Sequence, residues 1–160
     1  MRGRACTGQH GTPAQPVTLR LVSIPPRLQK IVDEFRQAPE PLRLPLLLEY
    51  ANKLPPLPEG VSGELERVHE CQTPLFLKTE VEEGKVMLYF EAPAEAPTTR
   101  GFASVIMAGL DGAEVEELLA VPDDFYEAMG LAKLISPLRL RGMGAIVGRI
   151  KRSLRAYANI

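Results

Sequence analysis

The sequence predicts an α+β domain in which a small antiparallel sheet of about three strands packs against helices on one side. Apolar residues recur at helical spacing in the early and late parts of the chain, whereas a middle segment alternates with a period of two, as strands do. The two kinds of segment do not alternate along the chain, as they would around a parallel sheet. A chain of 160 residues is long enough to bury one such core.

The first 22 residues are expected to form a disordered tail, which leaves residues 23–160 as a single domain. This tail contains scarcely any apolar side chain, so ordering it would cost chain entropy with little burial in return. Cys6 and His10 lie in the tail and are therefore expected to be incidental.

Two helices are predicted to follow the tail as a helical hairpin. Ser23 can cap the first helix, which is expected to end at Ala38 before a proline. Pro41 can open the second, which is expected to end at Leu54 because two prolines follow. Residues 55–63 are rich in proline and glycine, a composition typical of an extended crossing loop.

The period of two predicts a β-hairpin in the middle of the chain. Strands are expected over residues 73–81 and 86–90, joined by a turn at residues 82–85 that contains a glycine. A short strand at residues 65–68 can add a third member to the sheet.

Two further helices are predicted between the hairpin and the C-terminal part of the chain. Thr98 or Thr99 can cap the first of them, whose apolar residues follow helical spacing. A short helix is expected over residues 122–129, closed by Gly130.

The last helix has the clearest local signals, with Ser136 as its cap and Pro137 as its first residue. A continuous apolar stripe predicts that this helix packs on the sheet. Gly142, Gly144 and Gly148 each cost about 1 kcal/mol relative to alanine in a helix, which suggests close approach of another backbone. Its basic residues are expected to form a solvated face: Arg149, Lys151, Arg152 and Arg155.

Composition excludes several classes of function. The 19 basic and 20 acidic residues give a formal charge of −1, which would attract neither nucleic acid nor an anionic membrane surface. The sequence shows neither a continuous apolar stretch long enough for a membrane helix nor the apolar core of a secretory signal. Two cysteines cannot form the disulfide framework of a small secreted protein. The chain is therefore expected in the cytoplasm.

Cys71 is the residue best placed for chemistry. It lies in a polar run just before the first clear strand, where a thiol can be reached by a partner. As a thiolate it could attack a persulfide and carry the sulfane sulfur onward. From the local sequence alone, a role as a small buried hydrophobe is equally open.

The neighbours of Cys71 suggest further candidates. Glu70 would raise the pKa of the thiol, so a cation should offset it, and Arg139 and Arg100 are candidates, although a solvated surface role is more common for each. His69 could act as a base or a ligand, but an ordinary polar strand residue is the commoner outcome. Cys71 and His69 supply two ligands where a structural metal needs about four, so no metal site is expected.

The sequence resembles the SufE family of sulfur-acceptor proteins from roughly residue 25 to residue 157. Short motifs carry the resemblance, and together they are fairly specific although none would suffice alone. They are Leu54-Pro-Pro-Leu-Pro in the early loop, Val68-His-Glu-Cys71-Gln72 before the strand, Arg100-Gly101 opening a helix, and Ser136-Pro-Leu-Arg139 with Gly142-Met143 in the last helix. The chain departs from the family at Glu70, where a small residue is usual, and at Thr73-Pro74, where a Ser-Gln type continuation is usual.

The resemblance implies a fold related to the IscU-type scaffold proteins, with Cys71 as the acceptor cysteine. It implies that Cys71 takes sulfur as a persulfide from a cysteine desulfurase of the SufS type, stimulates that enzyme, and delivers the sulfur to a scaffold complex of the SufBCD type for iron-sulfur cluster assembly. Arg139 matches an arginine near the acceptor loop, where it could stabilise a thiolate or persulfide. Pyridoxal phosphate (PLP) would belong to the partner, and this chain is expected to bind no cofactor.

Two alternatives to a sulfur carrier stay open. The chain could be a non-catalytic module that docks on a desulfurase and adjusts its activity, or a thiol hydrolase in which His69 serves Cys71 as a base. As a carrier it would be an accessory protein rather than a stand-alone enzyme. The sequence is compatible with either a monomer or a homodimer.

Overall fold

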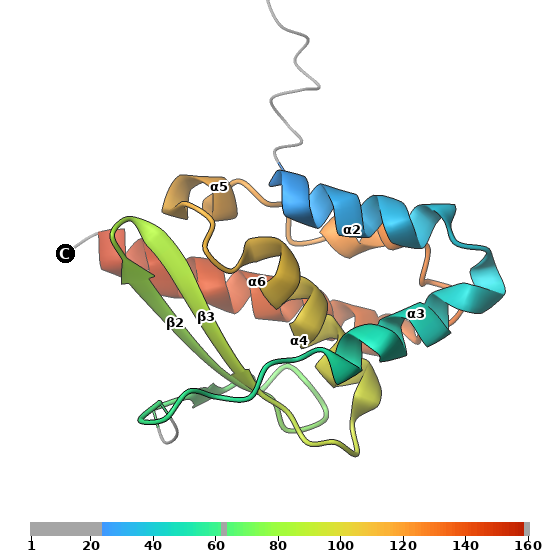
Figure 1. The fold of residues 1–160 in the computed structure, drawn as a ribbon, viewed down its shortest axis with the longest axis horizontal. Helices are drawn as coiled ribbons and strands as arrows, with labels where there is room; N and C mark the ends of the chain where they lie inside the picture. Colours follow the sequence, from blue (N-terminus) through green and yellow to red (C-terminus); the bar gives the residue numbers. More distant parts are fainter. Residues whose placement is uncertain (1–23, 62–63, 159–160) are drawn as a thin grey trace, which may run out of the picture.

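The computed structural model describes residues 24–61 and 64–158 (Figure 1). The predicted tail at residues 1–22, with Cys6 and His10, and the predicted cap at Ser23 lie outside these residues. The elements in chain order are α2 (Pro26–Gln37), α3 (Glu40–Asn52), β1 (Glu66–Arg67), β2 (Phe76–Glu82), β3 (Lys85–Glu91), α4 (Pro97–Leu110), α5 (Val115–Leu119), the 3-10 helix η1 (Phe125–Met129) and α6 (Pro137–Ala158). Within the described part of the chain, no helix has both the length and the apolar character needed to cross a bilayer.

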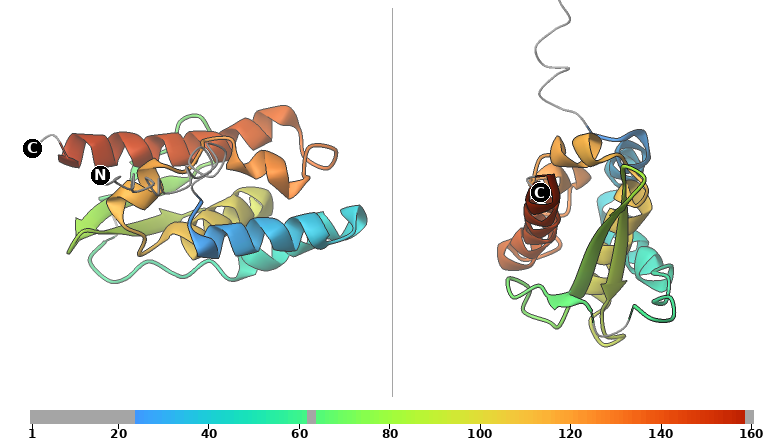
Figure 2. Two further views of the ribbon diagram at one scale, coloured as in Figure 1. Left: turned by 90° about the horizontal axis from the view of Figure 1, so that it is seen from above. Right: turned by 90° about the vertical axis from the view of Figure 1, so that its left-hand side faces the viewer.

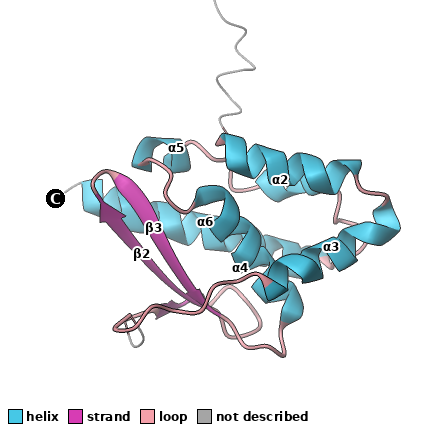
Figure 3. Cartoon of the chain, in the orientation of Figure 1, coloured by secondary structure: helices cyan, strands magenta, loops and turns pink. Residues whose placement is uncertain are grey.

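The three strands form one antiparallel sheet in the order β1-β2-β3, as the period-two pattern predicts (Figure 3). In the β2–β3 register Leu77 faces Phe90, which places both side chains on the same face. This face is buried, and α4 and α6 both contact the sheet. The predicted α+β fold with helices on one side of a three-stranded sheet is therefore confirmed.

The core lies between α6 on one side and helices α2 and α3 on the other, with α4 between them (Figure 2). Residues 101–106 of α4 are all buried, because this helix contacts neighbours on every side. Most of the predicted apolar stripe of α6 is buried as well: Met143, Ile146, Val147, Ile150 and Leu154. Its last predicted member, Tyr157, is instead exposed near the end of the helix. Each buried side chain of the stripe stabilises the fold by about 1.5–3 kcal/mol relative to an exposed position.

The helix starts differ from the prediction in three places. Helix α2 begins at Pro26 with Pro25 at its N-cap, where the sequence predicts Ser23. Helix α4 begins at Pro97 with Ala96 at its N-cap, so neither Thr98 nor Thr99 caps it. Proline at the first position fixes the backbone for a helix start two residues earlier than a cap at Thr98 would allow. Of the predicted helix at residues 122–129, only η1 is helical, and Gly130 closes it in the left-handed region with φ of 70°.

Local signals describe α6 well. The backbone N–H of Arg139 donates to the Ser136 hydroxyl at 3.4 Å, and Pro137 is the first helical residue, as predicted. Of the three glycines in this helix, Gly144 is the one that meets another backbone, because a Cβ there would lie 3.0 Å from the carbonyl oxygen of Asp123. The predicted close approach is therefore made at Gly144, whereas Gly142 faces a side chain of the site described below.

Arg43 of α3 connects the C-terminal end of α2 to Gly130, the residue that follows η1. Its Nε donates to the carbonyl oxygens of Phe35 at 2.9 Å and Ala38 at 3.1 Å. Its terminal nitrogens donate to the carbonyl oxygens of Arg36 at 3.2 Å and Gly130 at 3.1 Å. One guanidinium thus satisfies carbonyls that the end of a helix leaves without an intrahelical partner.

Candidate functional site

Cys71 lies in the short loop that joins β1 to β2. The loop is closed at its base by a hydrogen bond from the Val68 N–H to the carbonyl oxygen of Leu75 at 2.8 Å. The Cys71 N–H donates to the carbonyl oxygen of Val68 at 3.2 Å, which forms a turn just before the cysteine. Val68 and Leu75 are fully buried, so the loop is anchored in the core while its tip stays near the surface.

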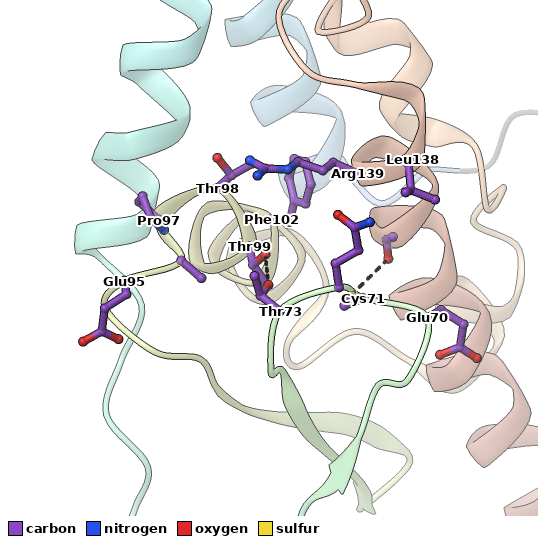
Figure 4. A pocket seen from close by; sticks show the side chains of 13 residues that line it. Glu70, Cys71, Thr73, Glu95, Pro97, Thr98, Thr99, Phe102, Leu138 and Arg139 are labelled. Atoms are coloured by element: carbon purple, nitrogen blue, oxygen red, sulfur yellow. Dashed lines mark hydrogen bonds between the residues drawn. The ribbon is translucent and has the colours of Figure 1, made fainter.

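A hollow of about 150 Å³ opens beside this loop (Figure 4). The loop forms one wall, the N-terminal turn of α4 with the residues before it forms another, and the first turns of α6 form the third. Among its lining residues are Glu70, Cys71, Thr73, Glu95, Pro97, Thr99, Phe102, Leu138, Arg139 and Gly142. The thiol is thus placed where a reacting group of moderate size could approach it.

The Cys71 side chain is half-buried and is seated on α6. Its Sγ lies 3.8 Å from the carbonyl oxygen of Gly142, to which the thiol donates. A Cβ at Gly142 would lie 3.5 Å from the sulfur, an ordinary van der Waals contact, so the seat leaves little room beyond a methyl group. The sequence marks this glycine only as a helix-weakening residue and does not indicate its contact with Cys71.

Burial raises the pKa of the Cys71 thiol to about 11. The carboxylate of Glu70 contributes to this rise, as the sequence predicts, and the guanidinium of Arg149 opposes it. At neutral pH the thiol is almost entirely protonated, with about 1 in 10,000 molecules ionised. In the free protein Cys71 is therefore a weak nucleophile.

Glu70 is bound by two arginines of α6. Arg149 Nη2 lies 3.2 and 3.3 Å from the two carboxylate oxygens of Glu70, and Arg152 Nη2 lies 3.5 Å from one of them. A hydrogen bond from its own backbone is the main cause that lowers the pKa of the Glu70 carboxyl, and both arginines add to the effect. Figure 4 shows this carboxylate on the α6 side of the loop, turned away from Arg139.

The other predicted site residues take different positions. Arg139 lines the hollow, and its guanidinium extends across the hollow toward Thr98 (Figure 4). Arg100, the second candidate cation, instead donates from Nη1 to the carbonyl oxygen of Ala92 at 2.7 Å and is not among the lining residues. His69 is exposed and does not line the hollow either.

Sequence reasoning missed Arg149, which it assigned to a solvated face. Arg149 follows Gly142 by two helical turns, so both residues face the same loop, but this follows only once Cys71 is known to pack on α6. One signal was available: α6 contains no acidic residue, so its arginines must find carboxylates elsewhere in the chain.

A side-chain hydrogen bond ties the loop to α4. The hydroxyls of Thr73 and Thr99 lie 2.7 Å apart, two residues after Cys71 and in the first turn of α4. The loop is thus held on both of the helices that wall the hollow. In the described ranges, no three His, Cys, Asp or Glu side chains are gathered as metal ligands.

Comparison with known proteins decides the family. The family described as "SufE: Fe-S metabolism associated domain" matches residues 29–154, which is most of the chain. The chain belongs to the SufE family. This membership places it in iron-sulfur metabolism and implies a cysteine desulfurase as a partner.

Relatives in the SufE family match over much of the chain. An uncharacterized SufE-like protein of Mycobacterium tuberculosis is 53% identical over 135 residues, covering 83% of this chain and 94% of that protein. SufE-like protein 1, chloroplastic/mitochondrial, of Arabidopsis thaliana is 31% identical over 121 residues, covering 75% of this chain and 32% of that protein. The solution structure of a hypothetical protein from Thermus thermophilus superposes with a TM-score of 0.77 at 47% identity, covering 86% of this chain and 99% of that one.

Proposed function

We propose that this chain is a sulfur carrier that accepts sulfane sulfur as a persulfide on Cys71. The donor is a cysteine desulfurase of the SufS type, whose turnover the chain stimulates, and the recipient is an iron-sulfur scaffold complex of the SufBCD type. The observation that carries the proposal is the position of Cys71, a thiol at the rim of a three-walled hollow on a chain of the SufE family. The cysteine use of the chain fits a reducing compartment, so we place this reaction in the cytoplasm.

The transfer is a thiol exchange at a single sulfur atom. The Cys71 sulfur attacks the terminal sulfur of the persulfide on the desulfurase cysteine, and a new S–S bond forms on Cys71. The S–S bond to the desulfurase cysteine breaks, and its electron pair leaves with that cysteine as a thiolate. The proton lost by Cys71 neutralises this thiolate, so no external oxidant or reductant is required. PLP remains on the desulfurase, where it releases sulfur from free cysteine.

Two features of the site suit this role. The raised pKa of Cys71 keeps the resting thiol protonated, which protects it from oxidation until a persulfide is presented. Arg139 lines the hollow and can donate charge-assisted hydrogen bonds to an anionic sulfur once one has formed. His69 is exposed and does not line the hollow, so we do not assign it a role and set the hydrolase alternative aside.

The proposal is tested by mass spectrometry of the protein after incubation with a SufS-type desulfurase and cysteine. We expect the parent protein and Cys6→Ser to gain sulfur, and Cys71→Ser to gain none. A gain that survives Cys71→Ser and disappears with Cys6→Ser would overturn the assignment of Cys71.

A second candidate function is a non-catalytic module that stimulates the desulfurase by docking alone. It is favoured by the high pKa and half-buried position of Cys71, which make the free thiol unreactive. This candidate requires Cys71→Ser to stimulate desulfurase turnover as well as the parent does. A carrier requires the stimulation to be lost, since the enzyme persulfide is then no longer discharged.

A further inference from the structure

The loop that carries Cys71 is attached to α6 at two adjacent residues. Cys71 rests against Gly142, and Glu70 is bound by Arg149, two helical turns further along the same helix. Arg149 also reaches β1, because its Nη1 lies 3.7 Å from a carboxylate oxygen of Glu66. A single guanidinium therefore joins the strand before the loop, the residue before the cysteine, and α6.

Arg149 is unusual for an arginine on the outer side of a helix. Its side chain is 19% exposed, whereas that of Arg152, the other arginine on Glu70, is 63% exposed. A shielded ion pair is screened less by solvent than an exposed one, so most of the attraction on Glu70 comes from Arg149. Its Nη2 lies within hydrogen-bond distance of both carboxylate oxygens of Glu70, while its Nη1 is directed to Glu66.

The geometry points to Arg149 as a positioning residue of the sulfur-accepting loop: it holds the Glu70 carboxylate against α6 and offsets its charge beside the Cys71 thiol. This inference rests on the proposed function, in which Cys71 is the sulfur acceptor. It also explains how the loop accommodates a glutamate directly before the cysteine. Arg149 would act through Glu70 and the field at the sulfur rather than by contact with the incoming persulfide.

The charged groups around the Cys71 thiol determine whether removal of Arg149 raises or lowers the pKa of that thiol. Those that line the hollow or bind the loop are Glu70, Glu95, Arg139, Arg149 and the more exposed Arg152. Removing Arg149 takes a cation from the neighbourhood of Cys71 and at the same time leaves Glu70 less neutralised. Both changes disfavour the thiolate, so they add in the same direction.

Loss of Arg149 should leave the loop closed. The backbone hydrogen bond between Val68 and Leu75 and the hydroxyl contact between Thr73 and Thr99 do not involve α6. Because these contacts remain, the sulfur stays half-buried in the variant. A change in the pKa of Cys71 then reports the loss of the Arg149 charge and not a change in burial.

The test is the rate of iodoacetamide alkylation of Cys71 as a function of pH, in a Cys6→Ser background that leaves one thiol in the chain. We expect Arg149→Gln to move the rate profile to higher pH and to lower the rate at pH 8.5 by about threefold to tenfold, which corresponds to roughly half to one pKa unit. Glu70→Gln should move the profile to lower pH. Arg149→Lys, which keeps the charge but loses the fork, should fall between the parent and Arg149→Gln.

Two further variants isolate the contact. Arg155→Gln removes an exposed arginine from the same helix and should leave the profile where it is. In a Glu70→Gln background, the effect of Arg149→Gln should shrink, because part of it acts through Glu70. An unchanged or downward-shifted profile for Arg149→Gln, or an equal effect with Glu or Gln at position 70, would overturn the inference. If Arg149→Gln does not fold, the Glu70→Gln variant alone decides the test. A pH profile of its alkylation rate identical to that of the parent would then overturn the inference.

Sulfur uptake from the desulfurase separates this inference from the proposed function. If the parent takes up sulfur and Arg149→Gln takes it up at the same rate with an unchanged alkylation profile, only the role of Arg149 fails. If the profiles shift as expected and the parent takes up no sulfur on Cys71, the carrier function fails and the arrangement of Glu70 and Arg149 stands.

Discussion

Cys71 and Gly142 are in direct contact, with the cysteine sulfur 3.8 Å from the glycine carbonyl oxygen. A carbonyl oxygen accepts a hydrogen bond from the neutral thiol and repels the thiolate. This contact therefore acts in the same direction as burial, which raises the pKa of Cys71 to about 11. The resting site keeps its sulfur protonated and in place.

The first prediction concerns the pH dependence of Cys71 reactivity. In Cys6→Ser protein, the alkylation rate should rise about tenfold per pH unit beyond pH 9, because the thiolate population keeps growing until the pH reaches the pKa. The levelling-off is expected near pH 11. An ordinary exposed thiol levels off near pH 9, and a plateau there would show that the loop does not hold the sulfur in its half-buried seat.

The same shift has a consequence for folding. The folded state holds the Cys71 proton more tightly than the unfolded chain, whose thiol has a pKa near 9.0. This contribution to stability is fully present below pH 9 and is lost as the pH rises from 9 to about 11. Between these values, the free energy of unfolding should therefore fall more steeply for the parent than for Cys71→Ser, as measured by urea denaturation. Parallel curves of unfolding free energy against pH for the two proteins would contradict the raised pKa of Cys71.

Substitutions at Gly142 should separate helix propensity from the seat of the sulfur. Gly142→Ala places a Cβ 3.5 Å from the sulfur, an ordinary contact, and removes a helix penalty of about 1 kcal/mol. We expect an unchanged or higher melting temperature and an unchanged alkylation rate. Gly142→Val adds branches that reach into the position of Cys71, so the loop should be displaced and alkylation accelerated. Equal alkylation rates for the two variants would mean that the sulfur does not rest on Gly142.

The hydroxyl pair Thr73–Thr99 offers a test of the second attachment of the loop. Thr73→Val and Thr99→Val each remove one hydroxyl at nearly constant shape and should each cost about 1 kcal/mol of unfolding free energy. The double variant should cost less than the sum of the two, because the single variants each leave one half-buried hydroxyl without its partner. Thermal or urea unfolding of all four proteins completes the cycle. Strict additivity would indicate that the two hydroxyls do not interact.

Much of the fold could be predicted because its signals are local. Ser136 and Pro137 mark the start of α6 by side-chain and backbone properties that belong to those residues alone. The alternation through β2 and β3 requires only that one face be buried. The start of α4 was misplaced because the Thr99 hydroxyl is bound by Thr73, a partner far away in the sequence.

The sequence predicts the nucleophile of the candidate site, Cys71, but not all of the residues that surround it. Cys71 stands out as the cysteine beside a strand, and Glu70 is its neighbour in the chain, so the direction of their interaction could be foreseen. The role of Arg149 depends on how α6 is laid against the loop. No local pattern encodes that docking, because it results from the packing of the whole apolar stripe of α6.

Close packing at glycines was also only partly foreseen, and it leads to a further prediction. A Cβ at Gly101 of α4 would lie 2.7 Å from the carbonyl oxygen of Leu47 in α3, which is backbone and cannot turn away. Gly101→Ala should therefore lower the free energy of unfolding by about 1–3 kcal/mol. Gly148→Ala is the matched control, since a Cβ there meets only a side-chain oxygen of Asp123 at 3.6 Å. We expect it to be neutral or stabilising by up to about 1 kcal/mol, and equal effects of the two substitutions would contradict this packing.

The last prediction concerns Arg43, whose guanidinium bonds four carbonyl oxygens at the end of α2 and beside η1. Lysine retains the charge but offers a single nitrogen, which cannot reach carbonyls from Phe35 to Gly130 at once. Arg43→Lys should therefore destabilise the protein by about 1–3 kcal/mol, nearly as much as Arg43→Met, which keeps the apolar stem and removes every donor. Urea unfolding measures both. If lysine restored the stability of the parent, charge at the C-terminal end of α2 rather than the geometry of the fork would be what holds this junction together.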